Sequence, residues 1–170
     1  MIGSSILRGA ISQKLCKKIY VFEKNIKYQK QIKKINKKII LIKKIDKKIE
    51  NIDLVIISTP MSEYQKIIIK LNKNLSNHSL ITDVGSTRGN VAKLIKEKLS
   101  KKLNWVMSHP ISGSEASGPK FGNKNLFKLL IMFLYSLIGV EITNKSISFI
   151  FSSSSLIKII FLFIFFICFW

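Results

Sequence analysis

Between residues 6 and 108, apolar residues recur in two alternating patterns. Residues 18–23, 53–60, 79–84 and 104–108 are short, nearly continuous apolar runs, which are typical of strands buried on both faces of a parallel sheet. Residues 6–15, 62–75 and 91–99 carry apolar residues at spacings of three and four, which is typical of amphipathic helices. Strands that alternate with helices in this way predict an α/β fold with a doubly wound parallel sheet.

Lysine and isoleucine dominate residues 26–52, where the pattern is less clear. Asn25 can cap a helix in which Ile32, Ile35 and Ile39 recur at helical spacing. We therefore expect one or two amphipathic helices with solvated lysines, broken by a short strand at residues 39–42. A helix lying on a membrane surface is the alternative interpretation.

Composition limits the class of protein. The chain has 170 residues, of which 47% are hydrophobic, so it suits one domain and is not a disordered polyelectrolyte. Its two cysteines, Cys16 and Cys168, are too few for a disulfide framework or a zinc site, and we expect no metal site.

The formal charge of +20 suggests nucleic acid as a partner, but its chemistry argues against specific binding of that kind. Of 29 basic residues, 27 are lysine, and only Arg8 and Arg88 are arginine. Proteins that read phosphates and bases favour arginine, whose planar fork binds them bidentately. The abundance of lysine, isoleucine and asparagine is what AT-rich DNA encodes. Solvated surface is therefore the simpler interpretation, and a polyanion-binding face is the alternative.

The most distinctive residues stand at the ends of the predicted strands, where parallel sheets bind ligands. Gly3 and Ser4 open the first helix, Glu23 ends the first strand, and Thr59-Pro60 ends the second apolar run. The next two strands lead into Asp83-Val-Gly-Ser-Thr-Arg-Gly89 and His109-Pro-Ile-Ser-Gly-Ser-Glu-Ala-Ser-Gly118. These positions predict a ligand site along one edge of the sheet.

In this order and spacing the segments resemble the prephenate/arogenate dehydrogenase family. The patterns D-L-V-I-x-x-T-P, T-D-x-G-S-x-[KR]-G and H-P-x-x-G-[ST]-E-x-S-G-P match at residues 53–60, 82–89 and 109–119. Glu23 matches the family's acidic strand end, and Leu126-Phe127 matches its L-F pair. The resemblance covers residues 1–128 and implies an incomplete Rossmann-type, NAD(P)-binding domain of a cytoplasmic oxidoreductase. The implied reaction is oxidative decarboxylation of prephenate, or of arogenate; from prephenate it gives 4-hydroxyphenylpyruvate in tyrosine synthesis.

The resemblance also implies roles for residues near the substrate. His109 would take the proton of the substrate hydroxyl, which suits a side chain with an unperturbed pKa of about 6.5. Ser86 would hydrogen-bond near that hydroxyl and the histidine, and it can also serve as a helix N-cap. Gly113, Ser114 and Glu115 would line the substrate site.

On the cofactor side, Gly3 and Ser4 would lie near the pyrophosphate at a helix N-terminus, and Glu23 would bind the adenosine ribose. Thr59, Pro60 and Asp83 complete the predicted cofactor site. A carboxylate at position 23 favours NAD because it repels the 2′-phosphate of NADP. The neighbouring Lys24 leaves NADP open as an alternative.

The chain departs from the family pattern at both ends. Met1-Ile-Gly-Ser-Ser5 holds only the last part of the family's G-x-G-x-I-G-x-S fingerprint. We therefore expect the first strand, which is central in such sheets, to be missing and its two neighbours to be left unpaired. The pattern stops again near Lys128, so we expect the family's helical dimerisation domain to be absent and the activity to be little or none.

Residues 129–170 differ in kind from the rest of the chain. They carry a net charge of +1, against +19 for residues 1–128, and are rich in Phe, Ile, Leu and Ser. We interpret them as a hydrophobic tail outside the family, read from a shifted frame. The alternative is an anchor at 147–170, which would make the chain a non-enzymatic, basic, membrane-associated small protein, although Lys158 and five serines interrupt that segment.

Overall fold

A computed structural model describes residues 2–14, 16–108, 118–126 and 157–163. Helices and strands alternate through most of this length. The helices are α1 (Ile2–Ser12), α2 (Ile26–Ile35), α3 (Tyr64–Asn74) and α4 (Arg88–Lys98), with single 3-10 turns at η1 (Lys47–Ile49), η2 (Met61–Glu63) and η3 (Pro119–Phe121). The strands are β1 (Cys16–Glu23), β2 (Ile40–Ile42), β3 (Leu54–Ser58), β4 (Leu80–Asp83), β5 (Asn104–Met107) and β6 (Ile157–Phe163).

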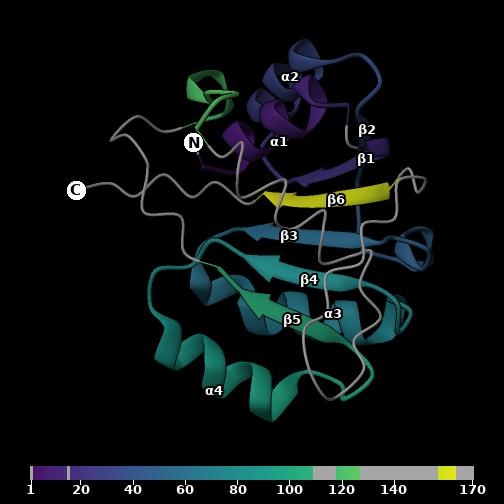
Figure 1. Cartoon of the computed structure of the whole chain (residues 1–170), viewed down its shortest axis with the longest axis vertical. Helices are drawn as coiled ribbons and strands as arrows, with labels where there is room; N and C mark the ends of the chain where they lie inside the picture. The colour runs from purple at the N-terminus through teal and green to yellow at the C-terminus, as the bar shows by residue number, and fades with distance from the viewer. Residues whose placement is uncertain (1, 15, 109–117, 127–156, 164–170) are drawn as a thin grey trace.

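The strands form one six-stranded sheet in the order β2-β1-β6-β3-β4-β5. Every neighbouring pair is parallel, and the arrowheads in Figure 1 point to the same side of the molecule. The α/β fold with a parallel sheet, predicted from the alternating patterns, is confirmed, and so is the Rossmann-like character that the family resemblance implies.

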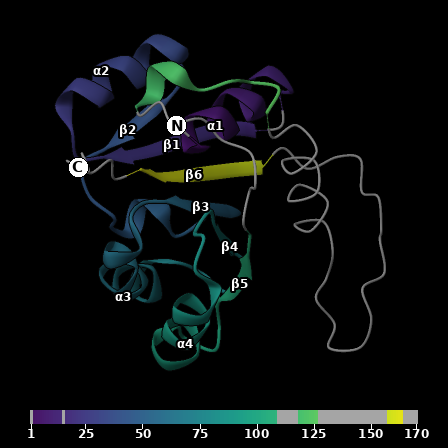
Figure 2. The ribbon, with the colours of Figure 1, turned by 90° about the vertical axis from the view of Figure 1, so that its left-hand side faces the viewer.

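Side chains of β3 pack into a core on both faces of the sheet. Leu54 and Ile56 belong to a buried cluster with residues of α1 and α2, whereas Val55 and Ile57 belong to a second cluster with residues of α3. This division follows from the period of two along a strand. In Figure 2, α1 and α2 lie together above β1, and α3 and α4 lie together below β3. The continuous apolar run at 53–60 therefore has the predicted cause, burial on two sides.

The lysine- and isoleucine-rich stretch forms one helix, one short strand and one turn. Asn25 caps α2, because its side-chain oxygen accepts hydrogen bonds from the backbone N–H groups of Lys27 and Tyr28. The short strand expected at 39–42 is β2. No second helix is found in this fully described stretch, where residues 47–49 make a single 3-10 turn.

The prediction that the two neighbours of the missing first strand are left unpaired is wrong. Strand β6, which comes from the tail, lies between β1 and β3 and pairs with both. The sheet thus gains its central strand from residues far along the chain. The division at residue 128 into a family domain and an unrelated tail stays a prediction.

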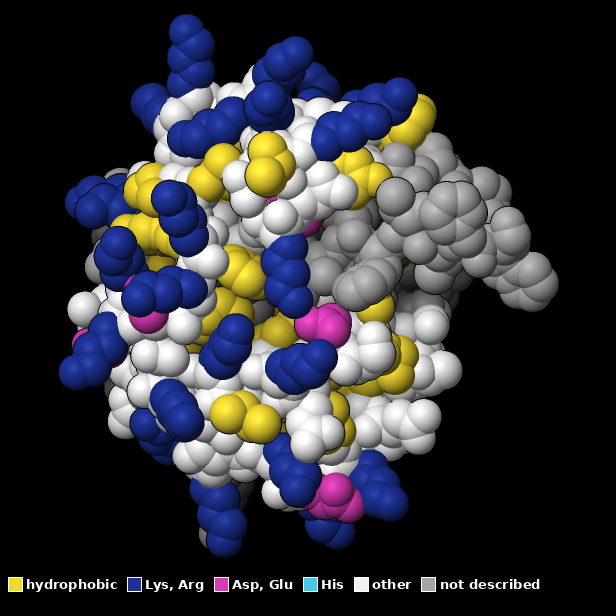
Figure 3. Space-filling view, turned by 180° about the vertical axis from the view of Figure 1, so that it is seen from behind, with side chains coloured by type: hydrophobic (Ala, Val, Ile, Leu, Met, Phe, Trp, Pro, Cys, Tyr) yellow, Lys and Arg dark blue, Asp and Glu magenta, His cyan; other side chains and the backbone are white. Residues whose placement is uncertain are grey.

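Within the part of the chain that the structure describes, no helix is long and apolar enough to cross a membrane. On the face shown in Figure 3, lysine and arginine side chains are spread over the surface rather than gathered in one patch. This distribution is consistent with solvated lysines on that face.

Candidate functional site

The ends of the parallel strands bring most of the predicted cofactor residues to one edge of the sheet. Glu23 at the end of β1 and Ser58 at the end of β3 both align with Phe163 of β6. Asp83 at the end of β4 aligns with Ile57 on one side and Met107 on the other. Figure 1 shows the N-terminus of α1 on the same side as these strand ends.

Glu23 and Ser58 both point to the face of the sheet that α1 covers. Along β1, Glu23 has the same parity as Ile19 and Val21, which pack in the cluster that includes α1. Along β3, Ser58 has the same parity as Leu54 and Ile56 of that cluster. The two polar side chains therefore stand on one face, close to where α1 begins.

Glu23 is 2% exposed, and the two oxygens of its carboxyl group differ in their hydrogen bonding. Its Oε1 accepts a hydrogen bond of 2.7 Å from the backbone N–H of Asn25, whereas Oε2 is buried with no hydrogen-bond partner among the described residues. Burial raises the pKa of Glu23 to about 7, although the backbone N–H donors of Asn25 and Lys24 and the charge of Lys24 act in the opposite direction. A buried acceptor without a donor is the kind of position that a ligand hydroxyl can satisfy.

Lys24 is turned toward a different carboxylate. Its Nζ lies 3.2 Å from Oε2 of Glu63, which also has Lys66 Nζ at 3.6 Å from Oε1. The hydrogen bond from Lys24 is the main reason that the pKa of Glu63 lies below its usual value. Lys24, the cation that could accommodate the 2′-phosphate of NADP, is thus already paired with the carboxylate of Glu63.

Gly3, Ser4 and Ser5 form the buried first turn of α1. The Ser5 hydroxyl accepts a hydrogen bond of 2.9 Å from the backbone N–H of Asn123, which ties the segment after η3 to this turn. A Cβ atom at Gly122 would lie 2.5 Å from Ser4 Oγ and 2.8 Å from Ser4 C. Gly122 therefore allows the backbone of that segment to lie directly on Ser4.

The residues after β3 have polar atoms near the same edge. Ser58 Oγ is buried without a hydrogen-bond partner in the described part of the chain. Thr59, 8% exposed, directs its hydroxyl to the carbonyl oxygen of Pro60 at 3.3 Å. Pro60 precedes η2 and offers no side-chain cap to it.

Asp83 lies on the opposite face of the sheet from Glu23, with both carboxylate oxygens occupied. Oδ2 accepts hydrogen bonds from the Tyr64 hydroxyl at 3.1 Å and from the backbone N–H of Gly85 at 3.0 Å. Oδ1 accepts one from Trp105 Nε1 at 3.0 Å. The pKa of Tyr64 is raised mainly by burial, and further by the charge of Asp83 and by the hydrogen bond between the Tyr64 hydroxyl and Asp83. These contacts fix the loop after β4 and give no support to the predicted cofactor role of Asp83.

The catalytic residues that the family resemblance implies lie at or beyond the ends of β4 and β5. Ser86 is exposed in the loop after β4, and Thr87 rather than Ser86 occupies the N-cap of α4, without a capping hydrogen bond from its side chain. Ser108, just before His109, donates a hydrogen bond to the Asp83 carbonyl oxygen and so joins the two strand ends. His109, Gly113, Ser114 and Glu115 lie outside the described residues, and their roles stay predictions.

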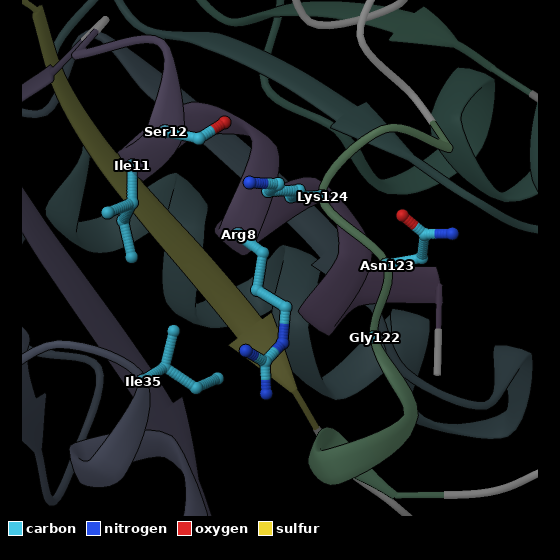
Figure 4. A pocket seen from close by; sticks show the side chains of 7 residues that line it. All are labelled: Arg8, Ile11, Ser12, Ile35, Gly122, Asn123 and Lys124. Carbon is cyan, nitrogen blue, oxygen red and sulfur yellow. The ribbon is translucent and has the colours of Figure 1, made fainter.

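A pocket of about 430 Å³ lies beside α1 but contains none of the predicted site residues (Figure 4). Arg8 Nη2 donates to the Pro119 carbonyl oxygen at 3.4 Å, and Arg8 Nε is buried with no hydrogen-bond partner in the described ranges. The lining residues are Arg8, Ile11, Ser12, Ile35, Gly122, Asn123 and Lys124. The lining residues from α1 lie one to two helical turns beyond Ser4 along that helix. The pocket is therefore separate from the strand ends.

Sequence reasoning missed the side chains that hold Asp83. Tyr64 lies in a predicted helix and Trp105 in a predicted strand, and both rings pack in the same apolar cluster, where Trp105 is partly buried. The available signal was chemical: a buried tyrosine or tryptophan usually needs a partner for its O–H or N–H group.

Comparison with known proteins identifies relatives of one kind. The family model for the nucleotide-binding domain of prephenate dehydrogenase matches residues 9–135. Prephenate dehydrogenase from Lactococcus lactis subsp. cremoris is 30% identical over 92 residues, covering 49% of this chain and 26% of that protein. Prephenate dehydrogenase from Bacillus subtilis is 33% identical over 75 residues, covering 44% of this chain and 20% of that protein.

Two solved structures have a similar fold. The Aquifex aeolicus prephenate dehydrogenase in complex with hydroxyphenyl propionate and NAD+ has a TM-score of 0.64 at 28% identity, covering 74% of this chain and 44% of that chain. A second structure of the Aquifex aeolicus enzyme has a TM-score of 0.65 at 25% identity, covering 81% of this chain and 55% of that chain. The chain therefore spans about half or less of the length of these relatives. With its family match over residues 9–135 and its shared fold, the chain belongs to the prephenate dehydrogenase family, of which it carries the nucleotide-binding domain.

Proposed function

We propose that this chain binds NAD as the nucleotide-binding part of an oxidoreductase that converts prephenate to 4-hydroxyphenylpyruvate in tyrosine synthesis. The observation that carries the proposal is Oε2 of Glu23, which is buried at a strand end and has no hydrogen-bond partner among the residues that the structure describes. An acidic side chain at this place in a Rossmann-type sheet accepts hydrogen bonds from the adenosine ribose. Family membership and the NAD+ complex of the Aquifex aeolicus relative support the same choice of cofactor.

The residues present fit a dinucleotide. Glu23 Oε2 would supply an acceptor for a ribose hydroxyl, and the positive end of the α1 dipole, on the same side as the strand ends, would favour a pyrophosphate. NAD is favoured over NADP because Glu23 repels a 2′-phosphate and Lys24 is engaged by Glu63 at 3.2 Å. The bound nicotinamide would accept the hydride in the reaction.

We assign the substrate chemistry to residues after β4 and β5. These two strands are neighbours in the sheet, and Ser86 lies in the loop that follows the first of them. In this proposal His109 removes the proton of the substrate hydroxyl, Ser86 orients that hydroxyl, and Gly113, Ser114 and Glu115 line the substrate site. We also propose little or no turnover by these 170 residues alone, since their match covers 26% of the Lactococcus relative.

Calorimetric titration of the purified chain with NAD, and with NADP in parallel, tests the cofactor assignment. We expect NAD to bind more tightly than NADP, and Glu23→Ala to weaken NAD binding about tenfold or more, a loss typical of a hydrogen bond to a charged group. Glu63→Gln is the matched control, because it alters the carboxylate paired with Lys24 and leaves Glu23 intact. Absence of NAD binding by the folded chain would contradict the proposal.

A separate assay tests turnover. Purified chain given prephenate and NAD is expected to produce no NADH above the background rate, followed by NADH absorbance. A rate close to that of the Bacillus subtilis relative would refute the expected low activity while supporting the assigned reaction.

A further inference from the structure

Strand β6 occupies the centre of the sheet although it comes from the end of the chain. It runs parallel to both neighbours, with its register to β1 extending from Cys16–Ile157 to Glu23–Phe163. Its register to β3 extends from Leu54–Ile159 to Ser58–Phe163. Figures 1 and 2 both show it between β1 and β3.

The slot between β1 and β3 demands a strand on physical grounds. Val21 of β1 packs in the apolar cluster on the α1 face of the sheet and Val55 of β3 in the cluster on the α3 face, so the sheet beside the slot is covered on both faces. An unpaired backbone N–H or C=O group costs about 1–3 kcal/mol when buried, and an open slot would leave a row of them on each strand. Helix α1 contacts both β3 and β6 and so covers the slot.

The tail segment has the strand propensity that the slot requires, and the connection to it is long enough. Residues 157–163 read Ile-Lys-Ile-Ile-Phe-Leu-Phe, a β-branched and aromatic run of high strand propensity. A parallel partner needs a connection of about a dozen residues or more, and residues 127–156 exceed that length.

We propose that the slot between β1 and β3 is a strand-binding groove that must be filled, and that residues 157–163, by filling it, stabilise the nucleotide-binding domain. The tail then has a folding function, in place of the roles of unrelated extension or membrane anchor. Because Phe163 aligns with both Glu23 and Ser58, the pairing also sets the spacing between the two strand ends whose buried polar atoms have no hydrogen-bond partner in the described part of the chain. The inference does not depend on NAD binding.

A designed disulfide in the full-length chain tests the pairing directly. Ser58 and Phe163 are aligned residues of neighbouring strands, whose Cα atoms lie about 5 Å apart, within the range that a disulfide spans. We expect Ser58→Cys with Phe163→Cys to cross-link under mild oxidation at least about fivefold more than Ser58→Cys with Phe151→Cys, a matched pair whose second cysteine lies in the tail outside β6. Both carry Cys168→Ser, and burial raises the pKa of Cys16 to about 12, which lowers the fraction of that thiol present as the reactive thiolate. Equal cross-linking in the two pairs would overturn the proposal.

Hydrogen exchange tests whether the pairing stabilises the sheet. Ile160 aligns with Tyr20 of β1 and Val55 of β3, and proline at this position removes a backbone donor and restricts φ. We expect Ile160→Pro to speed amide exchange in β1 and β3 by about tenfold or more, whereas Ile147→Pro, outside β6, leaves it unchanged. Unchanged exchange in the Ile160→Pro variant would also count against the proposal. If that variant fails to fold, the cross-linking experiment, which needs no destabilising substitution, provides the test.

Discussion

At Glu23, the state of one proton decides whether the carboxyl group can accept a ribose hydroxyl. The backbone N–H of Asn25 already occupies Oε1, so a proton on Oε2 would turn into a donor the carboxyl oxygen that has no hydrogen-bond partner among the described residues. Burial raises the pKa of this group to about 7. We therefore predict that NAD affinity rises about tenfold between about pH 6 and about pH 8, as the ionised fraction grows through that pKa. Titration calorimetry across this range measures it.

Glu23→Gln is the control for this pH dependence. Glutamine keeps the shape of the side chain and cannot ionise, so the variant should bind NAD weakly and with little change between the two pH values. A variant that retains the full pH dependence would show that another group is responsible.

The three hydrogen bonds to Asp83 predict a destabilising effect of Asp83→Asn. Tyr64, Trp105 and Gly85 all donate to this carboxylate, so an amide NH₂ group must face one of these donors and leave it unsatisfied. We expect a loss of about 1–3 kcal/mol in the free energy of unfolding, measured by urea denaturation.

Asp46→Asn provides the comparison for this substitution. Asp46 is a partly exposed cap, with Lys44 Nζ at 3.7 Å, whose oxygen accepts from the backbone N–H of Lys48 at 3.1 Å, and asparagine caps equally well. Its effect should stay within about 0.5 kcal/mol. Similar losses in the two variants would mean that the Asp83 contacts are not specific.

The helices and strands that the sequence predicts correctly are those marked by a short apolar run or a capping residue. The strand ending at Glu23 and the helix capped by Asn25 follow from short apolar and capping patterns. Isoleucines at 42, 45, 49 and 52 also repeat every three or four residues, yet they are buried in a strand end, a turn and loops. Helix α2 ends at Ile35, because Asn36 is extended and its side chain accepts from the Lys38 backbone N–H. Spacing alone does not distinguish a helix from successive turns that bury the same side of the chain.

The packing of the segment after η3 on α1 gives a prediction at Gly122. Its φ of −65° and ψ of 138° are open to any residue, so the space beside it decides the effect. Because an added Cβ would lie 2.8 Å from a backbone atom of Ser4, Gly122→Ala must push the segment off α1. We expect a loss of about 1–3 kcal/mol of stability by urea denaturation.

Gly89 in α4 offers the matched substitution. A Cβ there meets nothing within 4 Å, so Gly89→Ala should be neutral or stabilise by up to about 1 kcal/mol through helix propensity. If Gly122→Ala were equally harmless, the close approach to Ser4 would not be a constraint.

At the scale of the whole molecule, the sequence predicted the architecture and missed how its centre is filled. The alternating patterns imply a parallel sheet, and the motifs at strand ends imply its ligand edge. That residues 157–163 enter between β1 and β3 depends on pairing over more than a hundred residues, which no local pattern reports. The contacts of Asp83 with Tyr64 and Trp105 are non-local in the same way.

The net charge of +20 yields a prediction for the folded chain as a whole. Lys24, Lys44 and Lys66 have carboxylates within 4 Å, but 9 acidic residues cannot neutralise 29 basic ones. Repulsion among the remaining cations opposes compaction, and salt screens it over a Debye length of about 10 Å at 0.1 M. We expect the Tm to rise by several degrees between about 10 mM and about 200 mM sodium chloride, measured by circular dichroism. A neutral osmolyte at matched osmolality does not screen charge and is the control; a Tm that responds equally to both, or to neither, would show that lysine repulsion does not limit the stability of this fold.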